Sequence, residues 1–166
     1  MPIPAMSISI DFAIRYGELT DSSLVARKLV DRPIMAVASK SYLQKNGFPK
    51  HPNHLKNHSC IISNNNVWKF SDAGVQDSIK VKGRWRSNNT NAVVGACERG
   101  LGIAYMPKNT FDSAIKNGRL IPILEPFWGN SKGTSSWIVY QNKHFMPLRA
   151  RLAIDFLFQY FSDWEG

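Results

Sequence analysis

The stretch from Arg84 to Pro107 limits the possible fold more than any other part of the chain. Residues 87–89 are Ser, Asn and Asn, the residue types that cap helix N-termini, and small and apolar residues at helical spacing follow them. Gly100 is a typical helix stop. Residues 101–106 are mostly apolar and fit a short, buried, parallel strand. The stretch therefore predicts a strand, a polar cap, a short helix, a glycine stop and a second strand.

The start of this expected helix is the first candidate binding site. A helix N-terminus presents backbone N–H groups without intrahelical partners and carries a partial positive charge. When it follows the end of a strand, as it would after Trp85, it suits a small anion or a carbonyl group. Ser87 and Asn88 are therefore candidate ligand contacts.

Strand and helix patterns alternate along the whole chain, which favours the α/β class. Strands are recognised by alternating or continuous apolar residues and helices by apolar residues three or four apart. Pro122 has no N–H group to donate, so its strand should lie at a sheet edge. Strands are expected at residues 7–14, 24–30, 34–38, 61–62, 67–70, 78–85, 101–106, 119–124 and 137–140, and helices at 40–45, 90–99, 108–116 and from Pro147 onward.

Residues that directly follow the expected strands are further candidates for ligand binding. In open α/β sheets, ligands bind at the ends of strands. Arg15 and Tyr16 sit just past the first expected strand, and Ser39 follows the third. Arg15 could instead pair with an acid such as Asp11 or Glu18. Ser39 could serve mainly as the N-cap of the helix that follows it, a role that is compatible with binding.

Composition sets limits on the class of protein. The 166 residues are 43% hydrophobic and 20% charged, which suits one globular unit or two small lobes. No apolar run is long enough to span a bilayer, and residues 1–6 lack the features of a secretory signal. Cys60 and Cys97 show no paired spacing, so we expect two small buried hydrophobes in a reducing cytoplasm; the alternatives are a disulfide or a reactive thiol.

The net charge of +9 allows nucleic acid, anionic lipid or an acidic ligand as a partner. The basic residues are spread along the chain with one concentration: Lys80, Lys82, Arg84 and Arg86. On a single strand these four would share one face. That face is most simply a solvated sheet surface, and the alternatives are a subunit contact or contact with DNA phosphates.

Motifs for catalysis, metal binding and cofactor binding are not found. The sequence has no nucleophile elbow, no metalloprotease helix motif, no phosphate loop and no dinucleotide fingerprint. His51, His54 and His58 are close in sequence, but no cysteine or carboxylate completes a zinc set. We therefore predict a protein that is not an enzyme, with no catalytic residue, no metal ligand and no cofactor.

Three stretches in order resemble the effector-binding domain of LysR-type transcriptional regulators. The first is Asp11–Gly17 with Asp21–Leu29 after it, and the second is Ala36–Ser39 with Tyr42, Leu43 and Gly47. The third is Arg-Ser-Asn-Asn at residues 86–89, then a small-residue helix and Gly-Leu-Gly-Ile-Ala at 100–104 before Pro107. Short motifs recur by chance, but an ordered set covering residues 8–162 is specific.

The resemblance implies a periplasmic-binding-protein-like (type 2) fold with two lobes and two chain crossings. Regulators of this family carry an N-terminal winged helix-turn-helix, a linker helix and further first-lobe elements, so we expect the first lobe to be incomplete here. The expected first lobe is 7–33 with 139–162, the second lobe is 34–138, and the tails are 1–6 and 163–166.

The resemblance also implies a function: a cytoplasmic, effector-sensing domain that binds a small anionic metabolite between its lobes. DNA would be bound through a helix-turn-helix absent from this chain, by a homodimer or homotetramer, with no membrane partner. The alternatives are a solute-binding or transport receptor of related fold, and a direct nucleic-acid binder that uses the basic strand 80–86. The implied effector contacts are Arg15, Tyr16, Ser39 (at the hinge), Ser87, Asn88, Tyr105 and Met106.

Overall fold

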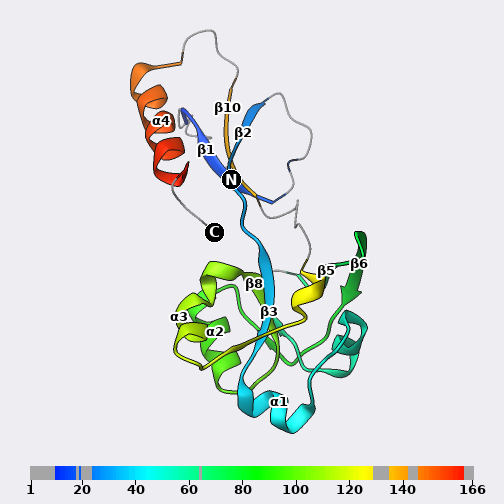
Figure 1. Cartoon of the computed structure of the whole chain (residues 1–166). Coiled ribbons are helices and arrows are strands. Elements are labelled where there is room, and N and C mark those ends of the chain that lie inside the picture. The colour runs from blue at the N-terminus through cyan, green and yellow to red at the C-terminus, as the bar shows by residue number, and fades with distance from the viewer. Residues whose placement is uncertain are drawn as a thin grey trace, which may run out of the picture. The chain divides into compact units, whose positions relative to one another are not determined.

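The structure is a computed structural model that describes residues 10–17, 19, 24–63, 65–128, 135–141 and 146–162. It divides into two compact units, which Figure 1 shows: unit 1 is Met1–Asp31 with Lys132–Gly166, and unit 2 is Arg32–Ser131. The chain therefore passes from unit 1 to unit 2 and back. Two sets of expected residues lie outside the described ones: the start of the first expected strand, and the tails 1–6 and 163–166.

Unit 1 contains a three-stranded antiparallel sheet in the order β1 (Ala13–Tyr16), β10 (Ser136–Gln141) and β2 (Leu24–Val30). All six residues of β10 pair with β2, so this strand belongs wholly to unit 1. The expected lobe boundary between residues 138 and 139 would divide it.

One helix, α4 (Leu148–Ser162), packs against the unit 1 sheet. Pro147 opens it as expected, because the Pro147 carbonyl accepts from the N–H groups of Ala150 and Arg151. The helical spacing of Ala150, Ala153, Ile154, Leu157 and Phe161 predicts one apolar stripe: Ala150 and Ile154 are buried, and the other three are half-buried. That stripe is confirmed as core. No helix in the described parts of the chain is long and apolar enough to cross a membrane.

The sheet of unit 2 has β3 (Ile34–Ala38) at its centre, between β8 (Ala104–Pro107) and β9 (Ile121–Ile123). Pro122 lies in an edge strand, as predicted. The parallel pairing expected after Gly100 is wrong for β8, which runs antiparallel to β3. The start of β3 lies beside the end of β8, because the Lys108 N–H donates to the Pro33 carbonyl at 2.8 Å. The two strands therefore run in opposite directions.

Two further strand pairs complete unit 2: β4 (Ile61–Ile62) parallel to β7 (Trp85–Arg86), and the hairpin of β5 (Val67–Asp72) and β6 (Val75–Lys80). The hairpin turn has positive φ at both Ala73 and Gly74, which matches the twist of the strands. The single strand expected over residues 78–85 is wrong, because residues 81–84 leave the ladder.

Short helices connect the strands of unit 2. The helix expected at 108–116 is broken at Phe111, whose side chain turns fully into the core. The helix expected at 40–45 is confirmed, with Ser39 as its cap. The helical segments are α1 (Lys40–Asn46), η1 (Pro52–Asn57), α2 (Thr90–Glu98), η2 (Lys108–Thr110), α3 (Asp112–Lys116) and η3 (Glu125–Phe127).

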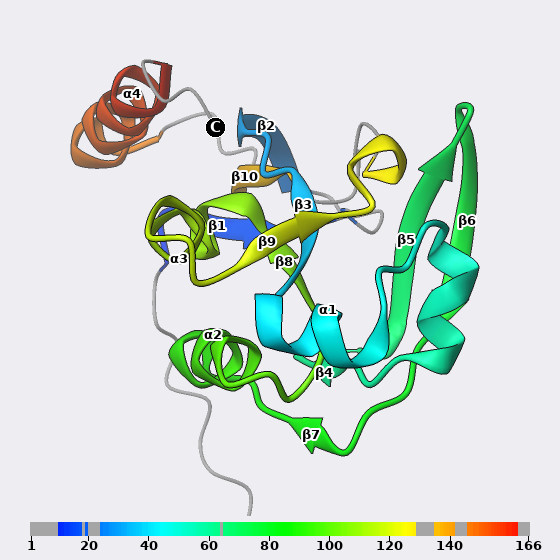
Figure 2. The same cartoon turned by 60° about the horizontal axis from the view of Figure 1, so that its bottom comes forward.

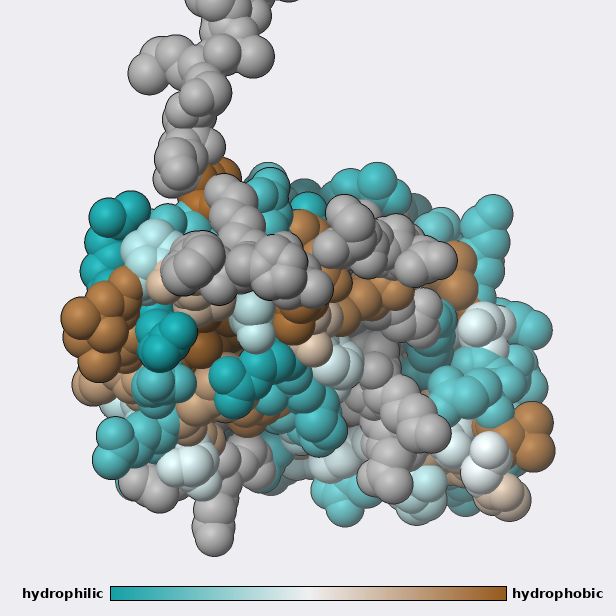
Figure 3. Space-filling model, turned by 90° about the horizontal axis from the view of Figure 1, so that it is seen from above, coloured by the Kyte–Doolittle hydropathy of each residue, from teal (hydrophilic) through white to brown (hydrophobic). Residues whose placement is uncertain are grey.

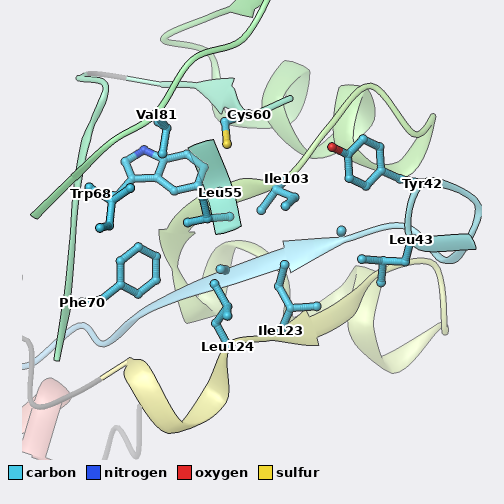
Figure 4. Packing of buried hydrophobic residues seen from close by; sticks show 13 residues of the cluster. Tyr42, Leu43, Leu55, Cys60, Trp68, Phe70, Val81, Ile103, Ile123 and Leu124 are labelled. Carbon is cyan, nitrogen blue, oxygen red and sulfur yellow. The ribbon is translucent and has the colours of Figure 1, made fainter. Parts of the chain in front are cut away.

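The strand β3 separates two hydrophobic clusters because its side chains alternate between faces. Met35 and Val37 pack with residues of α2 and α3, whereas Ala36 and Ala38 pack with α1, η1 and the hairpin. Figure 2 shows the hairpin and α2 as separate layers of this unit. Figure 4 shows Trp68 and Leu55 within the second cluster. Unit 2 is thus covered on both faces of its sheet.

Candidate functional site

Two parallel strands of unit 2 end beside each other in polar residues. Ser63 follows β4 and Ser87 follows β7, and the Ser87 N–H donates to the Ile62 carbonyl at 3.1 Å. Asn88 and Asn89 then lead into α2, and both are exposed. We call Ser63, Ser87, Asn88 and Asn89 the polar edge. It lies at the carboxyl ends of parallel strands, the place where α/β sheets bind ligands.

The cap of α2 is Asn89 rather than Ser87 or Asn88. The Asn89 Oδ1 accepts from the Ala92 N–H at 3.0 Å, and the Ser87 Oγ accepts from the Asn89 N–H at 3.1 Å. Ser87 therefore stabilises the turn that places Asn89 at the N-terminus of α2. Sequence reasoning recognised Asn89 as a good cap but left it out of the candidate contacts, because three consecutive capping residues do not show where the helix begins.

α2 is held firmly behind the polar edge. Val93, Ala96 and Cys97 are buried, and the Cys97 Sγ lies 3.4 Å from the Gly102 carbonyl oxygen. The helix ends at Glu98 with Arg99 as its C-cap, and a φ of +77° at Gly100 then allows the Leu101 N–H to donate to the Ala96 carbonyl. A helix fixed along its buried face presents its N-terminal N–H groups in a constant direction.

The two cysteines are structural, as predicted. Cys60 and Cys97 are buried free thiols. Burial raises the pKa of each thiol to about 12, which keeps both protonated at neutral pH. They act as small apolar side chains of the core.

Tyr105 and Met106 point to opposite faces of β8. The Tyr105 hydroxyl donates to the Lys69 carbonyl, and its ring stacks on Trp68 with 5.0 Å between centroids. Burial raises the pKa of Tyr105 to about 12. The Tyr105 hydroxyl therefore already has a hydrogen-bond acceptor in the hairpin. Met106 is half-buried against the cluster that includes Val93 of α2.

Ser39 does not lie at the hinge. It follows β3, whereas the chain enters unit 2 at the opposite end of that strand, near Pro33. The Ser39 Oγ accepts from the Tyr42 N–H at 3.3 Å and is buried as the cap of α1. The expectation failed because the direction of β3 carries Ser39 away from the crossing. The residue lines a separate open cavity of about 460 Å³ together with Lys40, Ser41, Glu98, Arg99 and Arg119.

Arg15 and Tyr16 lie within β1 rather than past its end, opposite Trp137 and Ser136 of β10. Both side chains are exposed. Asp11, one possible partner of Arg15, accepts from Arg149 Nε at 3.1 Å. The other, Glu18, lies outside the described residues.

The end of β1 lies close to the places where the chain leaves and re-enters unit 1. The Gly17 N–H donates to the Ser135 carbonyl at 3.1 Å, and the Ser135 Oγ donates to Asp31 Oδ1 at 2.6 Å. The hydrogen bond from Ser135, and then that from Lys28, lowers the pKa of Asp31. An ionised Asp31 therefore holds, through its hydrogen bond with Ser135, the two segments by which the chain leaves and re-enters unit 1.

The remaining sequence candidates are dispersed. The basic residues 80–86 are divided among β6, a linking segment and β7, so they do not form one strand face. The three histidines serve separate local contacts, such as the one between His58 Nδ1 and the Tyr42 hydroxyl at 3.1 Å. In the described ranges no three metal-binding side chains come together.

The polar edge offers hydroxyls, amides and backbone N–H groups. These neutral donors and acceptors suit recognition of a carboxylate or a carbonyl group.

Comparison with known proteins gives a consistent result. The family model described as "LysR substrate binding domain" matches residues 7–162. The HTH-type transcriptional activator AaeR of Escherichia coli is 30% identical over 97% of this chain and 54% of its own length. The HTH-type transcriptional regulator CrgA of Neisseria meningitidis is 32% identical over 89% of this chain and 50% of its own length. The chain spans about half the length of the curated relatives it matches.

Solved structures agree with the sequence comparisons. The full-length virulence activator AphB of Vibrio cholerae matches with a TM-score of 0.79 and 30% identity, over 91% of this chain and 52% of that one. The regulatory domain of CrgA from N. meningitidis matches with a TM-score of 0.73 and 31% identity, over 92% of this chain and 76% of that one. The relatives named here are regulators of transcription rather than enzymes.

Proposed function

This chain belongs to the LysR substrate-binding-domain family, and from that membership we propose that it is the effector-sensing part of a DNA-binding transcriptional regulator. Its α/β elements have the type 2 periplasmic-binding-protein-like fold of the solved regulatory domains. We propose a small anionic metabolite as the effector, bound between the two lobes as the family resemblance implies.

The observation that carries this proposal is the polar edge of unit 2. Helix geometry leaves the N–H groups of Thr90 and Asn91 without intrahelical partners, at the positive end of a nine-residue helix. Ser87 and Asn88 add a hydroxyl and an amide beside them. A carboxylate is the small group that these donors would bind most favourably. In unit 1, exposed Arg15 and Tyr16 would supply a cation and a hydroxyl.

Such a ligand acts only if it binds two arrangements of the lobes with unequal affinity. In the whole regulator that difference would be passed to paired DNA-binding domains, in a homodimer or homotetramer working in the cytoplasm. The regulator names of the relatives favour this function over a solute receptor. The division of the basic group disfavours direct nucleic-acid binding through one basic strand.

The proposal is tested by calorimetric titration of the chain with a panel of short aliphatic and monoaromatic carboxylates. Ser87→Ala and Arg15→Ala should each weaken binding of the best carboxylate about tenfold, since a hydrogen bond to a charged group contributes about 1.5–3 kcal/mol. Ser41→Ala and Arg99→Ala are matched controls, because both residues are exposed and lie by the cavity near Ser39.

Two outcomes count against the proposal. If no carboxylate binds, the proposed ligand class is wrong. If a carboxylate binds and the controls weaken it while Ser87→Ala and Arg15→Ala do not, the effector site lies at the other cavity and the assignment of the polar edge fails.

A further inference from the structure

The open cavity of unit 2, of about 460 Å³, has a lining that is entirely polar or charged. Its walls are the start of α1, the end of α2 and the segment shortly before β9. Figure 1 and Figure 2 show α1 and α2 beside each other in this unit. We call it the α1–α2 cavity, and its lining residues are Ser39, Lys40, Ser41, Glu98, Arg99 and Arg119.

The charges around the α1–α2 cavity do not balance. The carboxylate of Glu98 is matched by one cation, because its Oε1 lies 3.3 Å from Arg119 Nε. Lys40 and Arg99 are both exposed, and neither forms an ion pair with any residue that the structure describes. The Arg99 Nη1 donates to the Gly95 carbonyl at 3.1 Å, which leaves its other N–H groups available. Three cations and one carboxylate therefore give the cavity an excess of two positive charges.

Two hydroxyl groups of the lining are held close together. The Ser39 and Ser41 Oγ atoms lie 3.1 Å apart, and Ser39 Oγ also accepts from the Tyr42 N–H. Whichever serine donates, only one of the two hydroxyl hydrogens is used between them. The other hydrogen can be donated to an acceptor in the cavity. Because Ser39 is buried, the pair is held in a constant position.

Gly100 keeps the space beside this hydroxyl pair open. A Cβ at this position would lie 3.2 Å from Ser41 Oγ and 3.5 Å from Ser39 Oγ. A residue with a side chain would also be strained at the φ of +77°. The glycine that follows α2 therefore leaves both hydroxyls accessible from the cavity.

The polarity of the lining limits the class of ligand. A hydrophobic ligand would find no apolar side chain among the six lining residues. Large exposed hydrophobic residues gather on α4, which carries Leu148, Leu152, Phe156 and Tyr160. In Figure 3, hydrophobic side chains reach the surface on the left of the view, where α4 lies in Figure 1. The α1–α2 cavity thus suits a charged, hydrogen-bonding ligand.

We infer that the α1–α2 cavity binds a phosphate group, either as inorganic phosphate or as part of a phosphomonoester. A phosphomonoester carries a charge of about −1.5 to −2 at neutral pH, which matches the two excess positive charges. Its oxygens accept hydrogen bonds from the ammonium of Lys40, the guanidinium of Arg99 and the serine hydroxyl pair. A single carboxylate would neutralise only one of the two charges. The site is thus distinct in chemistry from the polar edge.

The volume of the cavity favours the phosphomonoester of these two. Sites for small molecules enclose about 300–1,000 Å³, and the α1–α2 cavity lies within that range. It is larger than a phosphate group alone requires, so an organic substituent can be accommodated. Neither ligand requires an effector at the polar edge, so this inference stands apart from the function proposed above.

Two-dimensional NMR of the chain tests the inference, with separate titrations of inorganic phosphate and ethyl phosphate at constant ionic strength, since salt screens exposed charges. We expect saturable changes in the amide signals of residues 39–41 and 98–100, and none at 87–92. Tighter binding of ethyl phosphate would identify a phosphomonoester as the ligand, and tighter binding of inorganic phosphate would identify the free ion.

Lys40→Ala and Arg99→Ala should each weaken phosphate binding about tenfold or more, because each removes a charge-assisted hydrogen bond. Lys80→Ala and Arg84→Ala are the matched controls, since both residues are exposed in unit 2 and lie outside the cavity lining. Circular dichroism checks that each variant keeps its fold.

A change at Glu98 gives a second measurement in the opposite direction. Glu98→Gln should strengthen phosphate binding severalfold, because Arg119 loses its carboxylate partner and can donate to the ligand. Asp77→Asn is the control for the change in net charge, since Asp77 is exposed on β6 of the hairpin.

The inference is overturned if phosphate binding does not saturate, if the controls weaken it as much as Lys40→Ala and Arg99→Ala, or if Glu98→Gln leaves it unchanged. If Ser87→Ala weakens phosphate binding and Lys40→Ala does not, phosphate binds at the polar edge. That result would overturn this inference and leave the proposed function standing. Failure of every carboxylate to bind would count against the proposed function alone.

Discussion

The two units differ in how completely they bury their hydrophobic side chains. Of the hydrophobic residues buried in the described part of the chain, 24 lie in unit 2 and four lie in unit 1: Ile138, Val139, Ala150 and Ile154. Large exposed hydrophobic residues show the opposite distribution, with four in unit 2 and eight in unit 1.

The difference follows from the layers around each sheet. In unit 2, helices cover one face of β3 and the hairpin with η1 covers the other. In unit 1, the described elements are three strands and the single helix α4. A closed core gives the polar edge of unit 2 a rigid base, whereas unit 1 gains most from a further covering surface.

The largest expected effect compares the same substitution in the two units. Ile103 and Ile138 are both fully buried, the first in unit 2 and the second in unit 1. Ile103→Ala should lower the free energy of unfolding by about 4 kcal/mol and Ile138→Ala by about 2 kcal/mol, because a cavity costs most where its surroundings cannot collapse. Urea denaturation of both variants measures the difference.

The exposed residue Leu101 provides the control for this pair, and Leu101→Ala should change the free energy of unfolding by less than about 0.5 kcal/mol. An equal loss for Ile103→Ala and Ile138→Ala, or a greater loss for Ile138→Ala, would contradict the view that unit 2 alone has a closed core.

The next effect tests how tightly the strands of unit 2 are packed. A Cβ at Gly83 would collide with the backbone carbonyl of Cys60. The Cys60 N–H also donates to the Lys82 carbonyl at 2.9 Å, so neither segment can shift alone. Gly83→Ala should therefore cost about 1–3 kcal/mol or more of stability. Thermal denaturation against wild type measures this cost.

Gly95→Ala is its counterpart, because a Cβ there would meet only the end of the flexible Arg99 side chain, 3.0 Å away. This substitution should be neutral or slightly stabilising, since alanine favours a helix interior. A Gly83→Ala variant as stable as Gly95→Ala would show that the contact between residues 83 and 60 is loose.

The smallest effect is a pH dependence in unit 2. Burial, and then the nearby His54, lowers the pKa of His58 below its ordinary value of 6.5. The unfolded chain therefore takes up this proton first as the pH falls. The contribution of neutral His58 to stability is complete above pH 6.5 and is lost as the pH falls through the folded-state pKa.

Denaturation midpoints at pH 7.5 and 5 should differ less in His58→Gln than in the wild-type chain. The same slope in both would mean that His58 takes up its proton equally in the folded and unfolded states.

Local signals predicted much of the fold. Strands 24–30 and 34–38 and the cap at Ser39 are confirmed, because proline, serine and apolar runs act within a few residues. The unbroken strand at 78–85 and the parallel pairing of β8 were wrong. Both depend on distant contacts, the first between Gly83 and Cys60 and the second with β3.

The candidate site shows the same limit. Ser87 and Asn88 were found because capping residue types lie beside a helix in sequence. Ser39 was misplaced because the direction of β3 is a property of the whole sheet. The bond from Tyr105 to Lys69 joins residues far apart in the chain, so no local pattern indicated it. The role of these residues in effector binding remains a prediction.

The most direct test of the account is amide hydrogen exchange, measured by segment, with and without the carboxylate that binds best in the titration panel. We predict that the ligand slows exchange in residues 85–92 and 13–17 and leaves residues 40–46 unchanged. Slower exchange at 40–46 and around Arg99 and Arg119, with none at 85–92, would place the ligand in the other cavity and contradict the proposed effector site.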